Sequence, residues 1–272
     1  AAMRITVLSD NLPARGLEAE WGLSLYLAYQ GHALLLDTGA SDLFARNAEA
    51  LGLDLGAVAF GVLSHAHWDH ANGMDAFFAR NPSAPFYLQG SCGEVCFDHS
   101  PGLWRYEGPK RGLLDRFAPR LRYVTGAFSP LPGVHLLPHT TPGLARRGAA
   151  AGMFCLRAGQ WVPDAFSHEQ TLVLETPRGL VLLSSCCHAG ADTIIREVQA
   201  AFPGRPIQAI VGGFHLYETP DQEVRALARR LRDTGVAQIL TGHCTGERGF
   251  ALLQEELGEQ VTQFSTGLVV EL

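Results

Sequence analysis

The sequence contains almost no lysine: Lys110 is the only lysine among 21 lysine and arginine residues. We interpret this bias as genome composition, with thermal adaptation as a further contribution, and not as a functional signal. Aspartate and glutamate number 27, which gives a formal net charge of −6 at pH 7. This balance argues against nucleic acid as the main partner, because binding a phosphate backbone needs a basic surface.

The sequence also lacks a hydrophobic run long enough to cross a membrane. Its first residues predict a strand over 4–8 and carry no signal-peptide pattern, so we expect a cytoplasmic protein without membrane association. The six cysteines show none of the spacings of secreted disulfide scaffolds, which fits that compartment. With 272 residues, 47% of them hydrophobic, the chain can bury a large core within one domain.

The most informative feature that is present is a segment rich in metal-binding side chains, HAHWDH at 65–70. If its backbone is extended, His65, His67 and Asp69 point to one side, and a turn after Asp69 brings the last histidine round to them. Neutral imidazole and carboxylate suit zinc, and also iron or manganese. The competing interpretation is a polar loop with histidines by chance, but the apolar run 58–63 before the segment predicts a buried strand that ends at a site.

Three later histidines share one setting, in which a predicted buried strand leads into a turn of small residues. They are His188, His215 and His243. The ends of neighbouring strands face one another at a sheet edge, which gives His188 and His243 a route to the segment 65–70. One such histidine could equally be a hydrogen-bonded core residue, whereas three in the same setting favour a shared site.

Predicted strands and helices alternate in both halves of the chain, which favours an α/β fold. We predict a single domain over 1–272, because no boundary divides the pattern. Periodicity weakens at about 81–152, where proline and glycine recur, and we predict a lid-like insertion there. His99 and His139 fall in this insertion and are predicted to be loop residues at the surface.

The HAHWDH segment resembles the signature of the metallo-β-lactamase superfamily. The resemblance implies a four-layer αββα sandwich with one or two metal ions at an edge of its sheets. Asp37, in Asp-Thr-Gly, is similar to the superfamily's first motif, in which the aspartate braces the metal loop through hydrogen bonds. The alternative for Asp37 is an ordinary turn with a capping aspartate.

Three blocks in the second half resemble one branch of this superfamily, named after 7,8-dihydropterin-6-methyl-4-(β-D-ribofuranosyl)aminobenzene-5'-phosphate synthase. They are CCHAG at 186–190, GGFHL at 212–216 and HCTG at 243–246. Cys187 departs from the serine of the branch. Most superfamily hydrolases have a metal-bridging aspartate where this chain has Cys186, which is either a neutral wall thiol or a ligand.

The resemblance implies a ligand set for one or two divalent ions, with zinc favoured over iron and manganese. Asp69 orients the attacking water, or acts as its base if only one metal is bound, and His215 is a proton donor or substrate contact. We predict that His65, His67 and His188 hold one metal and that Asp69, His70 and His243 hold the second.

We predict a metal-dependent hydrolase that acts on a small phosphoester or related ester, because a bound metal generates hydroxide at neutral pH. The alternatives are a pterin-type synthase of the same fold and a metal-bound small-molecule sensor without turnover. A di-iron oxidase is disfavoured, because oxygen-reducing relatives carry glutamate where this chain has His67. The expected partner is a small-molecule substrate, and both a monomer and a homo-oligomer stay open.

Overall fold

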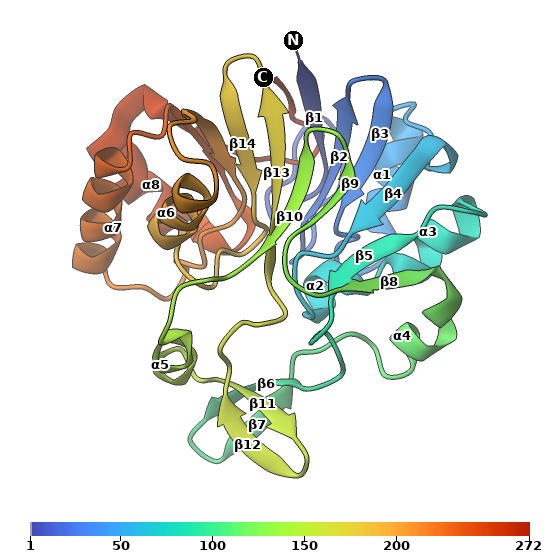
Figure 1. The fold of residues 1–272 in the computed structure, drawn as a ribbon, viewed down its shortest axis with the longest axis horizontal. Coiled ribbons are helices and arrows are strands. Elements are labelled where there is room, and N and C mark those ends of the chain that lie inside the picture. The colour runs from blue at the N-terminus through green and yellow to red at the C-terminus, as the bar shows by residue number, and fades with distance from the viewer. Residues whose placement is uncertain (1) are drawn as a thin grey trace.

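Two stacked sheets with helices on both outer faces form the protein, as the computed structural model of residues 2–272 shows (Figure 1). On one side, the first sheet is covered by α1 (Leu43–Ala50) and α3 (Met74–Arg80). On the other, the second sheet is covered by α6 (Ala191–Ala201), α7 (Asp221–Asp233) and α8 (Gly246–Leu257). This four-layer αββα architecture confirms the predicted fold class.

The first sheet has seven strands in the order β18-β1-β2-β3-β4-β5-β8. They are β1 (Met3–Ser9), β2 (Ser24–Tyr29), β3 (His32–Leu36), β4 (Val58–Val62), β5 (Phe86–Gln89), β8 (Leu121–Val124) and β18 (Val269–Glu271). The strands from β3 to β8 run parallel. Their carboxyl ends therefore meet at one edge, where Asp37 follows β3 and the segment 65–70 follows β4.

The second sheet also has seven strands, in the order β17-β16-β15-β14-β13-β10-β9. They are β9 (Phe128–Leu131), β10 (Val134–Pro138), β13 (Gln170–Thr176), β14 (Gly179–Leu183), β15 (Ile207–Val211), β16 (Gln238–Thr241) and β17 (Val261–Gln263). The strands β14 to β17 run parallel. The turns after β14, β15 and β16 carry His188, His215 and His243, so these three histidines share one edge.

Three apolar cores hold the layers together. The central core lies between the sheets and includes Leu25 and Val62 from the first and Leu136 and Val181 from the second. The outer cores pack α1 and α3, or α6, α7 and α8, against their sheets. Burial of apolar surface on this scale stabilises the fold by roughly 25 cal/mol per Å². It fixes the sheet edges, and with them the turns that follow the strands.

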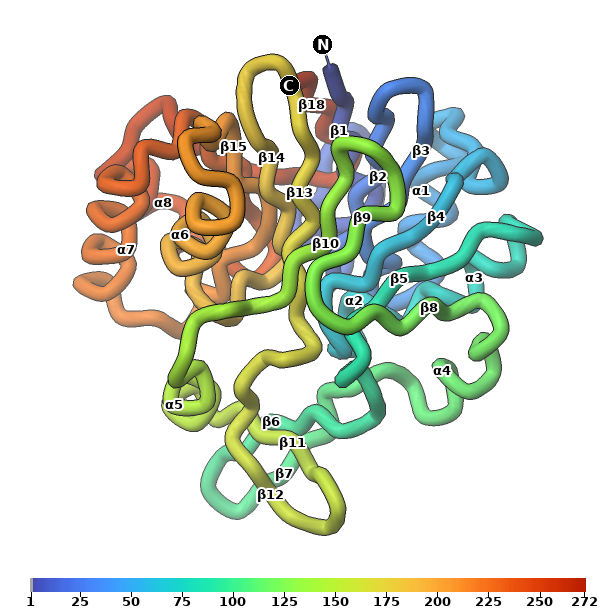
Figure 2. Tube along the Cα trace, viewed as in Figure 1, coloured from blue at the N-terminus to red at the C-terminus, as the bar shows by residue number. Residues whose placement is uncertain are grey.

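The region predicted as a lid-like insertion has two structural roles. It supplies β5, β8, β9 and β10 to the main sheets, together with α4 (Leu113–Arg116) between β7 and β8. A third, four-stranded sheet projects below the sandwich (Figure 2). Its strands are β6 (Cys96–Ser100), β7 (Leu103–Tyr106), β11 (Met153–Arg157) and β12 (Gln160–Pro163), and α5 (Leu144–Ala150) precedes β11.

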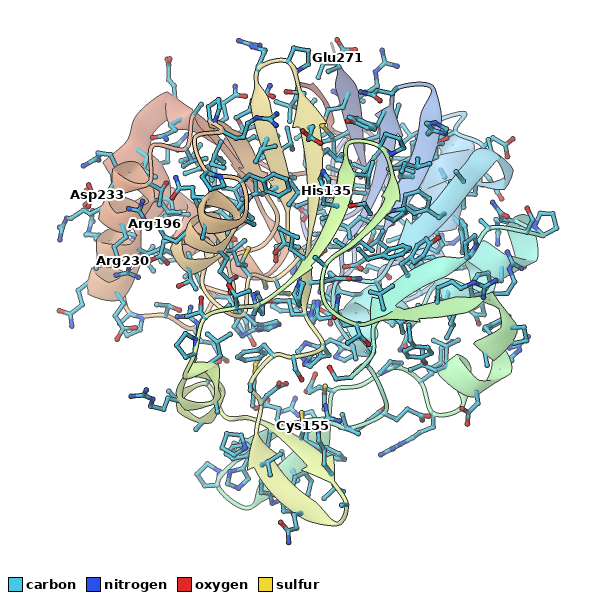
Figure 3. The ribbon with its side chains drawn as sticks, viewed as in Figure 1. His135, Cys155, Arg196, Arg230, Asp233 and Glu271 are labelled. Carbon is cyan, nitrogen blue, oxygen red and sulfur yellow. The ribbon has the colours of Figure 1, made fainter. Side chains whose placement is uncertain are left out.

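The projecting sheet explains why the sequence pattern weakens here. β7 and β12 are largely exposed, so their residues do not alternate between a core and a solvent face. Cys155 lies on β11 within this sheet (Figure 3). It is one of six cysteines within residues 2–272, and all six are buried and free of disulfides.

None of the helices formed by residues 2–272 combines the length and the apolar character that crossing a bilayer requires.

Candidate metal centre

The segment 65–70 reaches the site by changing from extended to helical backbone. His67 is extended, with φ −110° and ψ 150°, and the short helix α2 (Trp68–Ala71) begins directly after it. The extended backbone expected through Asp69 thus ends at His67, and this part of the prediction is wrong. The helical turn itself brings the carboxylate beside its neighbour: Asp69 Oδ2 is 3.3 Å from His70 Nε2.

Asp69, His70 and His243 form one group of converging ligand atoms, which we call the aspartate site. His243 Nε2 is 3.2 Å from His70 Nε2 and 3.1 Å from Asp69 Oδ2. Tetrahedral ligands of a zinc ion, with bonds of about 2.0–2.1 Å, lie about 3.3 Å from one another. All three side chains are buried. The spacing therefore suits one divalent ion at their centre.

Hydrogen bonds to the other ring nitrogens aim these imidazoles. His70 Nδ1 lies 2.7 Å from Asp37 Oδ2, and His243 Nδ1 lies 2.9 Å from Asn11 Oδ1. Because both partners are oxygen acceptors, each Nδ1 carries a proton, and Nε2 is the ring nitrogen that faces the site. Burial lowers the pKa of His70, but Asp69 and Asp37 reverse this and raise it to about 10 in the protein without metal.

Asp37 braces the segment 65–70, as the resemblance implied. Its Oδ1 accepts the N–H of Ser64, and its Oδ2 accepts the Ser64 hydroxyl, both at 2.7 Å. Since the Ser64 proton goes to Asp37, Ser64 Oγ accepts His65 Nδ1–H at 2.6 Å. One buried carboxylate therefore orients both His65 and His70.

The rings of His65, His67 and His188 lie side by side at the second predicted site, which we call the tri-histidine site, with centroids 4.5–5.0 Å apart. The ligand atoms of His65 and His188 converge with Cys186, whereas that of His67 lies nearer to those of Asp164 and His168. Burial and the neighbouring imidazoles lower the pKa of His65 and His188 well below the usual range, and burial lowers that of His67 to about 3. The rings are therefore neutral, which is the form that binds metal.

Unpaired nitrogens gather at this second group. Within residues 2–272, six buried side-chain nitrogen or oxygen atoms have no hydrogen-bond partner, and His65 Nε2, His188 Nε2 and His215 Nδ1 are three of them. A buried polar atom without a partner costs about 1–3 kcal/mol, so a cluster of them needs an explanation. A divalent cation among the three rings satisfies His65 and His188 at once, so the residues fit the metal that the fold implies.

Cys186 lies between the two groups. Its Sγ is 3.2 Å from His70 Nε2 and lies within 4.8 Å of the ligand atoms of the aspartate site and of His65 and His188. It also lies 3.4 Å from Cys244 Sγ. Burial raises the pKa of the Cys186 thiol, so it is protonated in the absence of metal. The sulfur thus occupies the place expected of a bridging aspartate.

His168, which the sequence did not single out, holds the segment 65–70 through a hydrogen bond to its backbone. His168 Nδ1 accepts the N–H of Ala66 at 3.0 Å, and its Nε2 donates to Asp164 Oδ2 at 2.9 Å. Cys96, Asp164 and His168 also lie within ligand distance of His67. Both His168 nitrogens are already bonded, unlike those of His65 and His188. Its position directly before the predicted strand 170–175 was the available signal.

His139 and His99 were both predicted to be loop residues at the surface, and the structure places them differently. The prediction of a surface residue is wrong for His139, whose side chain is 4% exposed and lies between Glu169 and Glu197. The loop after β10 folds against α6, and a single sequence gives no sign of that contact. His99 lies on β6, half-buried, where its ring stacks on Trp104 at 4.0 Å.

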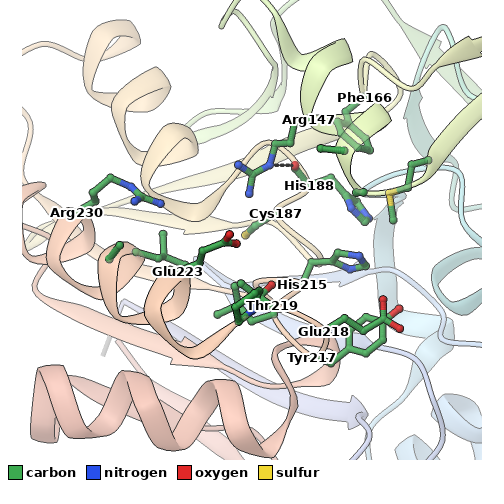
Figure 4. A pocket seen from close by; sticks show the side chains of 17 residues that line it. Arg147, Phe166, Cys187, His188, His215, Tyr217, Glu218, Thr219, Glu223 and Arg230 are labelled. Carbon is green, nitrogen blue, oxygen red and sulfur yellow. Dashed lines mark hydrogen bonds between the residues drawn. The ribbon is translucent and has the colours of Figure 1, made fainter.

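A cavity of about 590 Å³ opens beside the two groups (Figure 4). His188 and His215 line it at one end together with Arg147, and Glu223 and Arg230 line it toward α7 (Figure 4). The His215 ring is 4.6 Å from the His188 ring. A smaller cavity, lined by Trp21, Trp68, Asp69 and His188 among others, reaches the centre from the other side. A small molecule therefore has room next to the predicted ligands.

The structure thus brings together all six predicted ligands and His215, although their roles stay predictions. Fold and site define a protein of the metallo-β-lactamase fold whose clustered histidines and aspartates suit divalent metal ions. Residues 22–146 match the family model of the metallo-beta-lactamase superfamily. A solved structure described as a metal-dependent hydrolase of the β-lactamase superfamily is 29% identical, with a TM-score of 0.85 over 99% of both chains.

Two further relatives extend the comparison. The 7,8-dihydropterin-6-methyl-4-(beta-D-ribofuranosyl)-aminobenzene-5'-phosphate synthase of Methanocaldococcus jannaschii is 22% identical and aligns with 93% of this chain and 90% of its own. A diphosphatase of the PhnP family shares the fold, with 14% identity and a TM-score of 0.52 over 99% of this chain and 98% of that one. The resemblance to the superfamily and to its synthase-like branch is confirmed.

Proposed function

We propose that this protein is a metal-dependent hydrolase of a small phosphoester or related ester. The observation that carries the proposal is the convergence of ligand atoms on either side of Cys186: Asp69, His70 and His243 form one group, and His65 and His188 form the other. The buried Nε2 atoms of His65 and His188 are unpaired. The tri-histidine site would hold one ion and the aspartate site a second. Neutral imidazole with carboxylate favours zinc, with iron and manganese as alternatives.

A bound divalent ion supplies an acidified water and polarises the oxygen of the scissile bond. Asp69 is the residue that orients the attacking water. Burial raises its pKa, but His70 and His243 outweigh burial and hold the pKa well below the usual range. The carboxylate is therefore ionised and accepts a hydrogen bond at neutral pH.

His215 is placed to protonate the leaving group. Its ring lines one end of the large cavity, and its buried Nδ1 has no hydrogen-bond partner. Burial lowers its pKa, but contact with Cys244 outweighs burial and leaves the pKa above its usual value. This direction favours the protonated ring, which is the form that can transfer a proton to an alkoxide or phosphate oxygen.

Two observations support the proposed substrate class: the size and lining of the large cavity, and the names of two similar proteins. The large cavity has room for a ligand of small-molecule size, and two arginines, Arg147 and Arg230, are among its lining residues. One relative is named a diphosphatase, and the synthase has a phosphate-bearing product by name. A phosphoester satisfies both lines of support better than a neutral ester does.

A synthase of the pterin type is the second candidate, because the synthase aligns over nearly the whole of both chains. A synthase consumes two substrates and joins them, whereas a hydrolase consumes one substrate and water. Product analysis by mass spectrometry separates the two, since only hydrolysis incorporates ¹⁸O from labelled water.

The test combines metal analysis of the purified protein with turnover of a panel of phosphomonoesters, phosphodiesters and lactones. Asp69→Asn should reduce turnover of any substrate found by about 10²–10⁴-fold. Asp75→Asn is the matched control, because Asp75 lies on α3 and pairs only with Lys110 at the surface. Full turnover by the Asp69 variant would remove its role, and tight metal binding without turnover of the panel would favour a sensor.

A further inference from the structure

We propose that Glu169, His139 and Glu197 form a positioning triad that holds the His188 turn and so sets the metal affinity of the tri-histidine site. This inference rests on the proposed function, since it concerns one of the two predicted metal sites. The three residues come from separate elements: His139 follows β10, Glu169 precedes β13, and Glu197 lies on α6. The triad thus connects the helix layer to the edge of the second sheet.

The triad is a histidine clamped between two carboxylates. His139 Nε2 is 2.7 Å from Glu169 Oε1, and His139 Nδ1 is 2.8 Å from Glu197 Oε1. The side chains are 4%, 0% and 9% exposed, in the order His139, Glu169, Glu197. Both ring nitrogens face acceptors, so both must donate, and the ring is an imidazolium ion. Its two glutamates raise the pKa of His139 to about 10, although burial alone lowers it.

Glu169 connects the triad to the metal centre through hydrogen bonds to the His188 turn. Glu169 Oε2 accepts the N–H of His188 at 3.0 Å, and Glu169 Oε1 accepts that of Ala189 at 3.4 Å. At the other end, Glu197 Oε2 accepts N–H and hydroxyl groups of Thr140 and Thr141 at 2.7–3.0 Å. Every carboxylate oxygen therefore has a partner, as a buried charge requires, so the triad is a fully bonded and rigid unit.

The His188 turn needs such support. Cys187 adopts the left-handed conformation with φ +49°, which is unfavourable for a side chain with Cβ. The turn is held on its other side by Arg147, whose Nε donates to the His188 carbonyl at 2.6 Å (Figure 4). Phe166 stacks on the His188 ring, with centroids 5.1 Å apart. The N–H, the carbonyl and the ring of His188 are thus each fixed by a different neighbour.

Removal of His139 should act on His188 through Glu169. Without the imidazolium, two buried carboxylates lose their shared counter-charge, and Glu169 loses the hydrogen bond that fixes its Oε1 atom. The freed carboxylate then holds the N–H groups of His188 and Ala189 less firmly. The His188 Nε2 atom would then lose its alignment with the rings of His65 and His67. The aspartate site has its own supports, Asp37 and Asn11, and should be unaffected.

The chain offers a matched control in His135. This residue lies on β10, four positions before His139, and its Nε2 is 2.9 Å from Glu175 Oε2. Its other ring nitrogen bonds to Ser129, so it touches none of the predicted ligands. His135→Gln therefore removes a histidine–glutamate pair from the same strand without reaching the metal centre.

The test titrates the metal-free protein with Co²⁺. Calorimetry gives the affinity of each site, and the visible absorption of bound Co²⁺ reports on its ligands. We expect His139→Gln to weaken binding at the tri-histidine site by about 10–100-fold, the usual effect of losing an outer hydrogen-bond partner of a ligand. The aspartate site and the His135→Gln protein should bind as the wild type does. If His139→Gln fails to fold, Glu197→Gln provides a second test, because its amide NH₂ group must face either the imidazolium or the N–H groups of Thr140 and Thr141 and so breaks the clamp.

A double-mutant cycle tests whether His139 acts through His188 or only through the general stability of the fold. In a His188→Ala background the triad has no ligand to position, so adding His139→Gln should change Co²⁺ affinity less than about twofold. An equal loss with and without His188, or wild-type affinity in His139→Gln, would overturn the inference. A wild-type protein that binds no Co²⁺ at all would instead overturn the proposed function.

Discussion

The two predicted metal sites lie at the same end of the sandwich, where turns of both sheets meet, but they differ in what stabilises them without an ion. In the aspartate site, the carboxylate of Asp69 neutralises a protonated His70, and the ligand atoms pair with one another at 3.1–3.3 Å. The tri-histidine site has no negative charge of its own, and two of its nitrogens are unpaired. Two sites with three predicted ligands each can therefore differ in how far their geometry depends on the bound metal and on neighbouring residues.

The largest expected effect comes from removing a ligand of the less self-sufficient site. His188→Ala should reduce turnover more than about 100-fold, because loss of a direct ligand exceeds the 10–100-fold effect of losing an outer partner. Metal analysis should show one ion fewer than in the wild type. A His188→Ala protein with full metal content would break the comparison, since it would show that His188 is not a ligand.

Asp37 is the one residue that orients ligands in both sites, so it should affect both. Asp37→Asn places an amide where His70 Nδ1–H and the Ser64 hydroxyl need an acceptor. We expect metal affinity to fall about 10–100-fold at the two sites together. Asp54→Asn is the control, because Asp54 only accepts a hydrogen bond from Gly56 at a distant turn. Loss confined to a single site would contradict the shared bracing role.

The positioning triad should contribute a pH-dependent part of the free energy of unfolding, through the charge of His139. Because the folded pKa of His139 is raised to about 10, its contribution is complete below the unfolded value of about 6.5 and is lost as pH rises through about 10. Removing one partner of a buried charged pair costs about 3–5 kcal/mol. Urea unfolding of the metal-free protein should show this deficit for His139→Gln at pH 6.

The deficit should shrink steadily between pH 6.5 and 10, because the wild type loses its charged histidine over that range. His135→Gln should show a smaller deficit, since its ion pair is partly exposed and screened by solvent. A deficit that grows with pH would reverse the assigned charge of His139.

The smallest effect is that of metal on thermal stability. A ligand at 100 times its Kd stabilises the native state by about 2.7 kcal/mol per site. Zinc should therefore raise the unfolding midpoint of the wild type by more than it raises that of His188→Ala, which keeps only the aspartate site. Equal increments in a calorimetric scan would show that the second ion does not bind where the structure places the three imidazoles.

Sequence alone predicted much of this arrangement, and for identifiable reasons. Buried parallel strands give strong apolar runs, and the residues after them must meet at one edge, so His188 and His243 could be assigned to the neighbourhood of His65 and His67. The residues HAHWDH carried the ligand types in one short segment. The alternation of strands and helices indicated an α/β fold, and the resemblance of these motifs to the superfamily implied its αββα form.

The supports of the site were less predictable, because they depend on contacts between distant segments. Nothing in the sequence near His139 signals that Glu169 and Glu197 enclose it, since all three lie in different elements. The helical turn at Asp69 also escaped prediction, because a two-residue alternation looks the same in an extended loop and before a short helix. The projecting sheet is largely exposed and so leaves little hydrophobic pattern to read.

The most direct measurement is anomalous diffraction, at the zinc edge, from crystals of the wild-type protein loaded with zinc. The account predicts a peak within bonding distance of the Nε2 atoms of His65 and His188, and a second peak among Asp69, His70 and His243. Density only at the second position, or an ion ligated by His168 in place of His188, would contradict the central claim.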